Sequence, residues 1–343
     1  MTRYGPPVLY ALFVWWFATG LALYLVRLRP WTFRWSLLGA TVLLVASLWG
    51  LAVSAADTSA TGAYMAFTCT VLVWGWQEIG FLTGLLTGPW RQPCPDQCST
   101  GRRAGYAVAA ILYHELALVV LGVAVVAATW GGANQIGTWT FAILWVMRLS
   151  TKLNLFLGVP ILNDELLPAH LRYLGSFFAQ KPMNLLFPVS VTVSTVLLVV
   201  LLQWASAPDA PEGAVGYTLL AALTALAILE HWFMALPLPV AALWSWSLRA
   251  GASACPGEVD PVRRSRTCAD KESIACPGEV DPVRRSRTCR SSAVVPAPLS
   301  DAGHGHQPDD RSVAPMPEHR SHLATAPADD LVLPALATQW SRR

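Results

Sequence analysis

The sequence predicts an all-α, polytopic membrane protein with seven transmembrane helices. The chain has 343 residues, of which 54% are hydrophobic and only 13% are charged. Its mean hydropathy is +0.44 despite a long polar C-terminal region, a profile that excludes an ordinary soluble domain. A transmembrane helix needs about 20 predominantly apolar residues. No alternating strand pattern competes with the helical segments, so a membrane β-barrel is not expected.

Seven apolar segments are long enough to span a bilayer. We expect helices near residues 7–26, 36–56, 62–86, 106–129, 137–157, 184–205 and 215–236. We do not expect the first segment to be a cleaved signal peptide, because its arginines follow the apolar stretch instead of preceding it. The third segment contains Gly80, Gly84 and Gly88, which we expect on one helix face where a neighbouring backbone packs closely. Gly88-Pro89 then ends this helix.

The distribution of Lys and Arg predicts the orientation. Three alternate loops carry most of these residues before the C-terminal region, which is itself rich in Arg: Arg27, Arg29, Arg34, Arg91, Arg102, Arg103, Arg172 and Lys181. The opposite side carries Arg3 and otherwise only the acidic residues Asp57, Asp209 and Glu212. By the positive-inside rule, the N-terminus lies outside and the C-terminus inside. Seven helices also place the two termini on opposite sides.

The longest loop between predicted helices, residues 158–183, contains a short amphipathic stretch. Leu171, Leu174 and Phe178 fall on one face of it and Arg172 points toward the other. This pattern predicts a short helix lying in the cytoplasmic membrane interface.

The composition changes after the last predicted helix. We expect residues 1–250 to form the transmembrane domain and residues 251–343 to be a disordered cytoplasmic tail rich in Pro, Ala, Ser and His. The tail contains one 15-residue sequence twice, at 254–268 and 275–289. The copies are identical and hold almost no apolar residues to stack a core, so we interpret them as a recent tandem duplication.

The cysteines give no strong metal or disulfide signal. Six of the seven lie on the predicted cytoplasmic side, where a reducing compartment argues against structural disulfides. Cys94 and Cys98 form a C-x3-C pair, one residue wider than a zinc knuckle and without a second pair nearby. We interpret them as reduced loop thiols.

Seven ionisable side chains interrupt four of the predicted helices at a similar depth. They are Glu78, His114, Glu115, Arg148, Lys152, Glu230 and His231. The helical rise of about 1.5 Å per residue places them ~8–14 Å from the predicted cytoplasmic end of each helix. A charge in hydrocarbon costs at least ~2.5–3.5 kcal/mol, so such residues normally face the protein interior and pair with one another. Three carboxylates, two permanent cations and two imidazoles can nearly neutralise one another.

Four interpretations of this polar layer remain open. The first is a network of salt bridges and hydrogen bonds that holds four helices together. The second is a metal site, because carboxylate and imidazole suit iron, zinc or manganese. Its members would be Glu78, His114, Glu115, Glu230 and His231. The sequence lacks the spacing of familiar metal helices, however, since Leu118 stands where a zincin has its second His and no Glu-x-x-His occurs.

The third interpretation is tetrapyrrole binding, with His114 or His231 as a pigment ligand. A neutral imidazole in an apolar bundle can hold the central metal of a porphyrin or chlorin. Ala110 and Ala227 lie four residues before these histidines and leave room on the same helix face. The fourth is proton-coupled transport of a small molecule, although no pair of interrupted helices in matching halves indicates it.

Several motifs of the chain are long and unusual. They are Phe13-Val-Trp-Trp-Phe-Ala-Thr-Gly20, Trp74-Gly-Trp-Gln-Glu-Ile-Gly-Phe-Leu-Thr-Gly84, Ile111-Leu-Tyr-His-Glu-Leu-Ala117, Gly137-Thr-Trp-Thr-Phe, Trp145-Val-Met-Arg-Leu-Ser-Thr-Lys-Leu-Asn-Leu-Phe-Leu-Gly-Val-Pro160, Pro182-Met-Asn-Leu-Leu-Phe-Pro188 and Leu229-Glu-His-Trp-Phe233. With these motifs the chain resembles the PuhE family of photosynthetic complex assembly proteins of purple phototrophic bacteria. The resemblance covers roughly residues 5–250, and residues 251–343 depart from it.

The resemblance implies a multi-pass protein of the bacterial inner membrane, cytoplasmic or intracytoplasmic and photosynthetic. It implies a gene near those of the reaction-centre H subunit and the aerobic oxidative cyclase of bacteriochlorophyll synthesis. The implied function is support of reaction-centre and core-antenna assembly or of bacteriochlorophyll supply. The implied partners are subunits of those complexes or enzymes of bacteriochlorophyll synthesis, besides membrane lipids, and (bacterio)chlorophyll or a tetrapyrrole precursor is the expected cofactor.

The resemblance carries no catalytic residue to this chain. We therefore favour a non-enzymatic role, while the sequence leaves open a membrane metalloenzyme or tetrapyrrole-binding protein of bacteriochlorophyll metabolism, or a small-molecule transporter. We expect no nucleic-acid partner.

Overall fold

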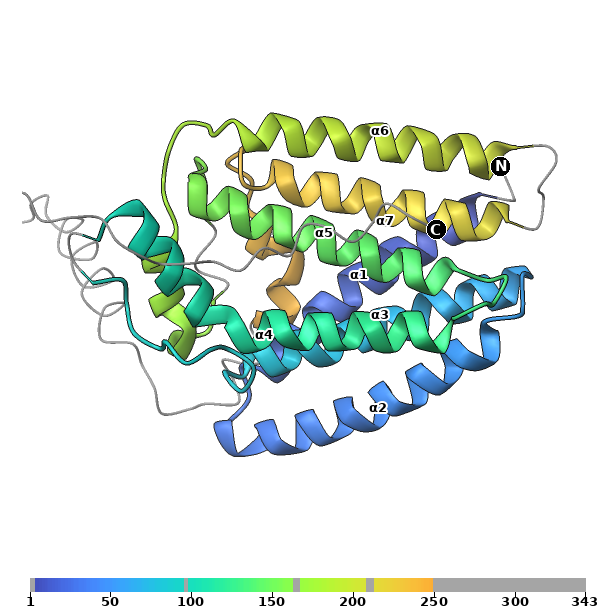
Figure 1. The fold of residues 1–343 in the computed structure, drawn as a ribbon, viewed down its shortest axis with the longest axis horizontal. Helices are drawn as coiled ribbons and strands as arrows, with labels where there is room; N and C mark the ends of the chain where they lie inside the picture. The colour runs from blue at the N-terminus through green and yellow to red at the C-terminus, as the bar shows by residue number, and fades with distance from the viewer. Residues whose placement is uncertain (1–3, 96–97, 163–166, 208–212, 249–343) are drawn as a thin grey trace, which may run out of the picture. The chain divides into compact units, whose positions relative to one another are not determined.

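The computed structural model describes residues 4–95, 98–162, 167–207 and 213–248. In these ranges the chain forms seven α-helices: α1 (Gly5–Leu25), α2 (Phe33–Ser54), α3 (Ala60–Leu82), α4 (Thr100–Ala128), α5 (Ile136–Leu157), α6 (Leu186–Ser206) and α7 (Ala214–Trp232) (Figure 1). The same ranges contain no strand beyond one isolated bridge between Val159 and Gln180. The predicted all-α fold is therefore confirmed.

Six of these helices are long and apolar enough to cross a membrane, so the chain is a multi-pass membrane protein. The exception is α3, which has 23 residues but carries Gln77 and Glu78 together with several Thr, Gly and Trp residues. The count of seven transmembrane helices and the N-outside orientation stay predictions. The predicted tail, 251–343, lies outside the described residues.

Side-chain caps start two of the helices. The Ser59 hydroxyl accepts a hydrogen bond from the Gly62 N–H at 3.3 Å at the start of α3, and Ser99 accepts from the Arg102 N–H at 3.5 Å at the start of α4. Each cap satisfies one of the N–H groups that a first helical turn leaves unpaired. In the loop before α3, hydrogen bonds from the side chain and backbone of Ser59 lower the pKa of Asp57.

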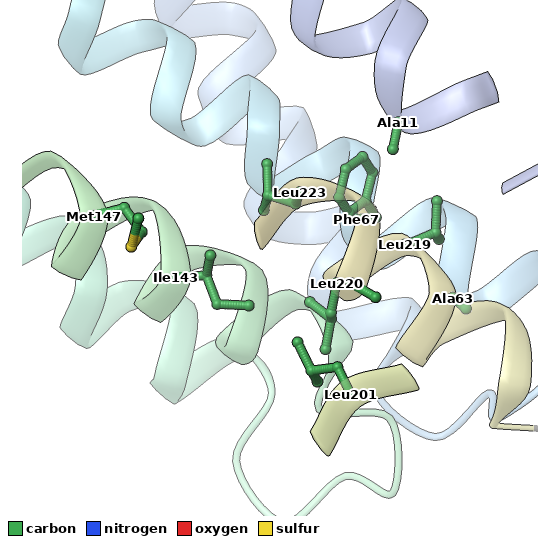
Figure 2. Packing of buried hydrophobic residues seen from close by; sticks show 10 residues of the cluster. Ala11, Ala63, Phe67, Ile143, Met147, Leu201, Leu219, Leu220 and Leu223 are labelled. Carbon is green, nitrogen blue, oxygen red and sulfur yellow. The ribbon is translucent and has the colours of Figure 1, made fainter. Parts of the chain in front are cut away.

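The helix α7 lies at the centre of the packing. In the most apolar part of α7, 56% of residues are buried, against 17–28% in the other five candidate spans. It contacts α1, α3, α5 and α6, whereas α2 packs on α3 and α4 at the edge. Figure 2 shows Leu219, Leu220 and Leu223 of α7 among Phe67 of α3 and Ile143 of α5. The helices that carry the polar layer therefore share a packed apolar core.

The third helix ends earlier than the sequence predicted. We expected it to reach residue 86, with Gly80, Gly84 and Gly88 on one face, but α3 ends at Leu82. The predicted glycine face is wrong because Gly84 adopts a φ of +80°, and the N–H groups of Leu85 and Leu86 both donate to the Gly80 carbonyl. This is the hydrogen bonding of a helix end closed by a left-handed glycine.

The segment after α3 turns back onto α4 and bends it. Gly88 lies so close to α4 that a Cβ atom there would overlap the carbonyl oxygen of Ala109. The carbonyl oxygen of Thr87 accepts hydrogen bonds from the N–H groups of Tyr113 at 2.9 Å and His114 at 3.2 Å. A group from outside a helix that inserts into its i→i−4 hydrogen bonds can kink the helix. Figure 1 shows the first turns of α4 tilted away from its remainder.

Two short 3₁₀ helices, η3 (Ala169–Phe177) and η4 (Val240–Trp244), pack against the ends of the long helices. The predicted short helix near residue 170 exists, but its buried face differs from the expectation. Leu171, Leu174 and Phe177 are buried, and Phe178 is not. The reason is the period of three residues in a 3₁₀ helix, which brings position 177 rather than 178 under residues 171 and 174.

Candidate functional site: the intramembrane polar layer

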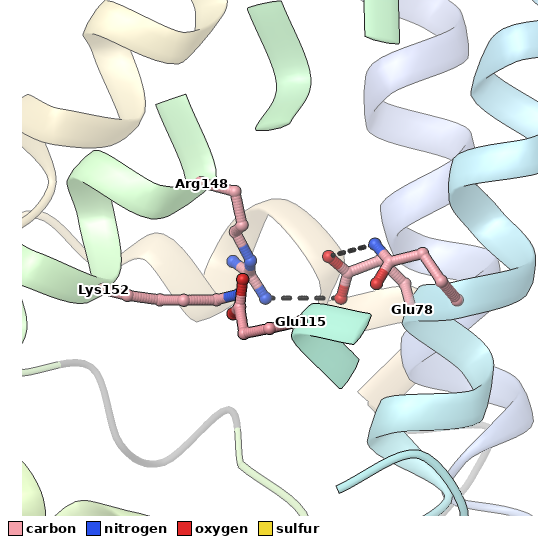
Figure 3. Close-up of polar contacts among 5 residues, drawn as sticks. Glu78, Glu115, Arg148 and Lys152 are labelled. Carbon is pink, nitrogen blue, oxygen red and sulfur yellow. Dashed lines mark hydrogen bonds and ion pairs between the residues drawn. The ribbon is translucent and has the colours of Figure 1, made fainter. Parts of the chain in front are cut away.

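Two ion pairs join α3, α4 and α5 (Figure 3). Arg148 Nη2 lies 3.3 Å from Glu78 Oε2, and Lys152 Nζ lies 2.6 Å from Glu115 Oε1. Arg148 and Lys152 are four residues apart and therefore share a face of α5, so one helix reaches both α3 and α4. The Gln77 side-chain amide adds a 3.2 Å hydrogen bond to Glu78 Oε1. Four of the seven predicted residues are thus brought together as pairs.

The ion pairs are partly enclosed rather than sealed. The side chains of Glu78 and Arg148 are 15% and 38% exposed, and those of Glu115 and Lys152 are 26% and 20% exposed. Removing one partner of an enclosed pair leaves an uncompensated charge, which costs more than the pair itself contributes. The pairs therefore hold three helices in register.

His231 belongs to a separate network of uncharged groups that joins α5, α6 and α7. Its Nε2 lies 2.8 Å from Ser150 Oγ and its Nδ1 lies 2.9 Å from the carbonyl oxygen of Ala227. Ser150 Oγ is in turn 2.9 Å from Ser190 Oγ, and the Asn154 amide donates to the Ser150 carbonyl at 2.9 Å. Both ring nitrogens of this buried histidine are therefore occupied.

Glu230 has a different bonding partner from both groups. Neighbouring residues of a helix point about 100° apart, so Glu230 and His231 face different sides of α7. The Glu230 residue is exposed, and its carboxylate accepts a 2.6 Å hydrogen bond from the indole N–H of Trp15 on α1. Among the described residues, ion pairs form only between Glu78 and Arg148 and between Glu115 and Lys152. Glu230 is held by an indole instead of a cation.

His114 is the least satisfied member of the layer. The residue is 0% exposed, and neither Nδ1 nor Nε2 has a hydrogen-bond partner within the described structure. Its ring packs on Phe81 with centroids 4.5 Å apart. Arg148 and Lys152 lie close enough to interact with it electrostatically. Buried polar side chains are normally hydrogen-bonded, so this imidazole differs from the usual structural histidine.

The five residues expected around a metal ion do not converge. Across the described ranges, no group of three or more His, Cys, Asp and Glu side chains is placed to hold a metal. The same finding covers Cys94 and Cys98, so the C-x3-C pair gains no further ligand from the described fold.

An apolar groove runs between α4 and α5, beyond the Glu115–Lys152 pair. Its volume is about 430 Å³, and its lining includes Gly122, Phe141 and Trp145. Thr138 is the one hydroxyl residue of the lining. The groove therefore suits hydrocarbon and offers no ionisable group of its own.

Sequence reasoning missed the uncharged partners of the layer. Trp15, Ser150, Asn154 and Ser190 all contribute, and none was expected to. Ser150 and Asn154 carried a usable signal, because they lie within one turn of Arg148 and Lys152 on the same predicted helix. Trp15 and Ser190 carried none, since their role depends on how α1 and α6 pack.

The sequence model of one protein family, described as protein of unknown function (DUF3623), matches residues 1–254. A protein of Rhodobacter capsulatus is 42% identical over 255 residues, which cover 73% of this chain and 93% of that protein. It is called the uncharacterized 30.4 kDa protein in the puhA 5' region. No solved structure matches.

Proposed function

We propose, from the premise that this chain belongs to the DUF3623 family, that it is a PuhE-type factor of the bacterial inner membrane. In this proposal it supports assembly of the photosynthetic reaction centre and core antenna, or the supply of bacteriochlorophyll to them. Its partners are subunits of those complexes or enzymes of bacteriochlorophyll synthesis. It acts as a scaffold and not as an enzyme.

The observation that carries this proposal is the similarity to the protein in the puhA 5' region of Rhodobacter capsulatus. The resemblance to PuhE implies a gene beside that of the reaction-centre H subunit. The printed name of that relative and the resemblance to PuhE support the same gene neighbourhood. The similarity covers 93% of that protein, so the two chains are alike over nearly its whole length and not over a short fragment.

The fold supports a scaffold. Charged pairs on one side of α5 and hydroxyl groups on the other side tie five helices together, namely α3, α4, α5, α6 and α7. Such a bundle keeps its outer faces in fixed positions, which is what an assembly factor needs to present partner subunits or pigment to one another.

Deletion of the gene in its phototrophic host tests the proposal. The near-infrared absorption of isolated membranes measures the reaction centre and core antenna, and solvent extraction measures total bacteriochlorophyll. We expect the complexes to fall while the transcripts of their subunits persist, and a plasmid copy to restore them. A fall in complexes at constant extracted pigment supports assembly, and a parallel fall of both supports pigment supply. Unchanged complexes in the deletion strain refute the proposal.

A further inference from the structure

The groove between α4 and α5 has a buried floor and an exposed rim. Gly122, Val125 and Phe141 of its lining are buried. Val119 and Val123 stand at the rim, with 45% and 65% of their surface exposed. Both helices are long and apolar enough to cross a membrane. The groove therefore opens sideways, toward the hydrocarbon of the bilayer.

Small residues create the space of the groove. A Cβ atom at Gly122 would lie 3.0 Å from the Phe141 ring, so this ring packs directly on the backbone of α4. Ala127 and Ala142 add little volume to the walls. The space that remains is about 430 Å³, which lies within the range of small-molecule sites, about 300–1,000 Å³.

The lining of the groove does not suit a polar ligand. No residue among the described ones that line it is ionisable. Its hydroxyl group belongs to Thr138, whose Oγ1 already lies 2.7 Å from Thr129 Oγ1. A polar ligand group would lose its hydrogen bonds to water here and gain few in return. The part of a ligand that lies in the groove is therefore hydrocarbon.

The length and direction of the groove match one leaflet of a bilayer. From Val119 to Ala127 the helical rise gives about 12 Å, and one leaflet contributes about half of a hydrocarbon core of about 30 Å. At the end of the groove, Trp130 is 82% exposed, and Trp139 nearby in the chain is 57% exposed. Exposed tryptophans of membrane proteins favour the level of the headgroups. The groove thus runs from that level into the leaflet, as an acyl chain does.

A single hydrocarbon chain fills this groove better than a helix of another protein. A helix is about 10–12 Å wide with its side chains, and transmembrane helices pack closely where small residues let their backbones approach. Here Gly122 lies below the rim made by Val119 and Val123, so a helix would rest on the rim. The floor would then lose its dispersion contacts. An acyl chain is narrow enough to follow the floor, and the bilayer supplies it at high concentration.

We propose that the groove between α4 and α5 holds one acyl chain of a membrane phospholipid, with the headgroup at the level of Trp130. The chain fills the space between the two helices and thereby takes part in their packing. This site is separate from the polar layer and does not depend on the function proposed above.

The test compares labelling of the groove with labelling of an exposed face that has no groove. The full chain is reconstituted in vesicles of phosphatidylethanolamine and phosphatidylglycerol with a trace of phospholipid that carries a diazirine in one acyl chain. After illumination, mass spectrometry maps the adducts. Val193 and Val196 of α6 are 63% and 59% exposed and meet bulk lipid. We expect residues 119–130 and 138–145 to be labelled about threefold or more above α6. Equal labelling overturns the proposal.

A filled groove provides the second comparison. Ala142→Leu adds a side chain inside the groove, and Ala46→Leu adds the same side chain on the exposed surface of α2. We expect Ala142→Leu to reduce labelling of the groove to the level of α6 and Ala46→Leu to leave it unchanged. Thermal unfolding checks that both variants are folded. Undiminished groove labelling in a folded Ala142→Leu protein contradicts the proposal. If that variant does not fold, the wild-type comparison decides alone.

Two further measurements identify the source of the hydrocarbon. Phytol, an isoprenoid alcohol, is added in an amount equal to the labelled phospholipid and should leave the groove adducts in place. Their displacement would assign the groove to an isoprenoid chain and reject the phospholipid. A photoreactive phenylalanine analogue at position 123 then captures the occupant in the host membrane. We expect a mass increase of one phospholipid, whereas a cross-linked polypeptide would show that the groove is a protein interface.

Discussion

His114 and His231 are 0% and 1% exposed, and both come from helices that carry a carboxylate beside the histidine. Around His231, α5 and α6 present the hydroxyl groups of Ser150 and Ser190. Around His114, α3 presents the Phe81 ring, and the cations that interact with it, Arg148 and Lys152, are engaged with Glu78 and Glu115. The comparison teaches that burial by itself does not define the role of an intramembrane histidine. The partners of its nitrogens do.

The largest effect is expected at Lys152, in the ion pairs near His114. Replacing Lys152 by Met leaves Glu115 uncompensated in a partly enclosed site, and we expect the unfolding free energy to fall by about 3 kcal/mol. Thermal unfolding in detergent measures this loss. The double variant Lys152→Met with Glu115→Leu should recover most of the stability, because no lone charge remains. A single variant as stable as wild type would show that the pair does not hold α4 and α5 together.

Residues 83–90, which follow α3 and pack on α4 beside His114, can be disturbed at Gly88. A methyl group at this position overlaps the backbone of α4. Gly88→Ala should therefore displace residues 83–90 and lower the unfolding free energy by roughly 1–3 kcal/mol. Hydrogen exchange of the Tyr113 and His114 amides should accelerate, since both donate to Thr87, while the amides around His231 stay protected. Gly75→Ala is the matched control, because nothing lies within 4 Å of its added methyl group. Equal effects of the two substitutions would contradict the close packing.

The hydrogen-bond network around His231 is tested at Ser150. We expect Ser150→Ala to destabilise the protein by about 1–2 kcal/mol, because His231 Nε2 and Ser190 lose a buried hydrogen-bond partner. Ser206→Ala is the control, since its hydroxyl donates to the Leu202 carbonyl of its own exposed turn. The measurement is the midpoint of thermal unfolding, and no difference between the two variants would argue against a structural role for the His231 network.

The smallest effect concerns Asp57, which lies in a loop outside the spanning helices. Hydrogen bonds from Ser59 hold its pKa below the ordinary value of 3.8. A carboxyl with a depressed pKa in the folded state stabilises the protein above that ordinary value and loses this contribution as the pH falls through the folded pKa. Asp57→Ala should therefore lower stability slightly at neutral pH and flatten the acid limb below about pH 4. This background must be subtracted before pH is used to compare the two histidines.

Much of the fold follows from local sequence. The apolar segments predicted all seven helices of the described ranges to within six residues at each end, because helix formation in an apolar environment depends on length and composition. The exceptions are segments in which tertiary contacts changed the structure that the local sequence predicted. The pattern of Leu171 and Leu174 was read with a helical period of 3.6, but packing beneath α3 and α4 produced a 3₁₀ helix and buried Phe177.

The sequence by itself determined that this is a helical membrane protein, and it predicts that seven ionisable groups lie at a similar depth in it. Residue type and position along a helix suffice for both, since the rise per residue is constant. Only the tertiary structure decided which groups meet. Pairing of Arg148 with Glu78, binding of Glu230 by Trp15, and the unpaired state of the His114 nitrogens depend on helix rotation and on the turn after α3. Those are set by contacts between segments far apart in the chain.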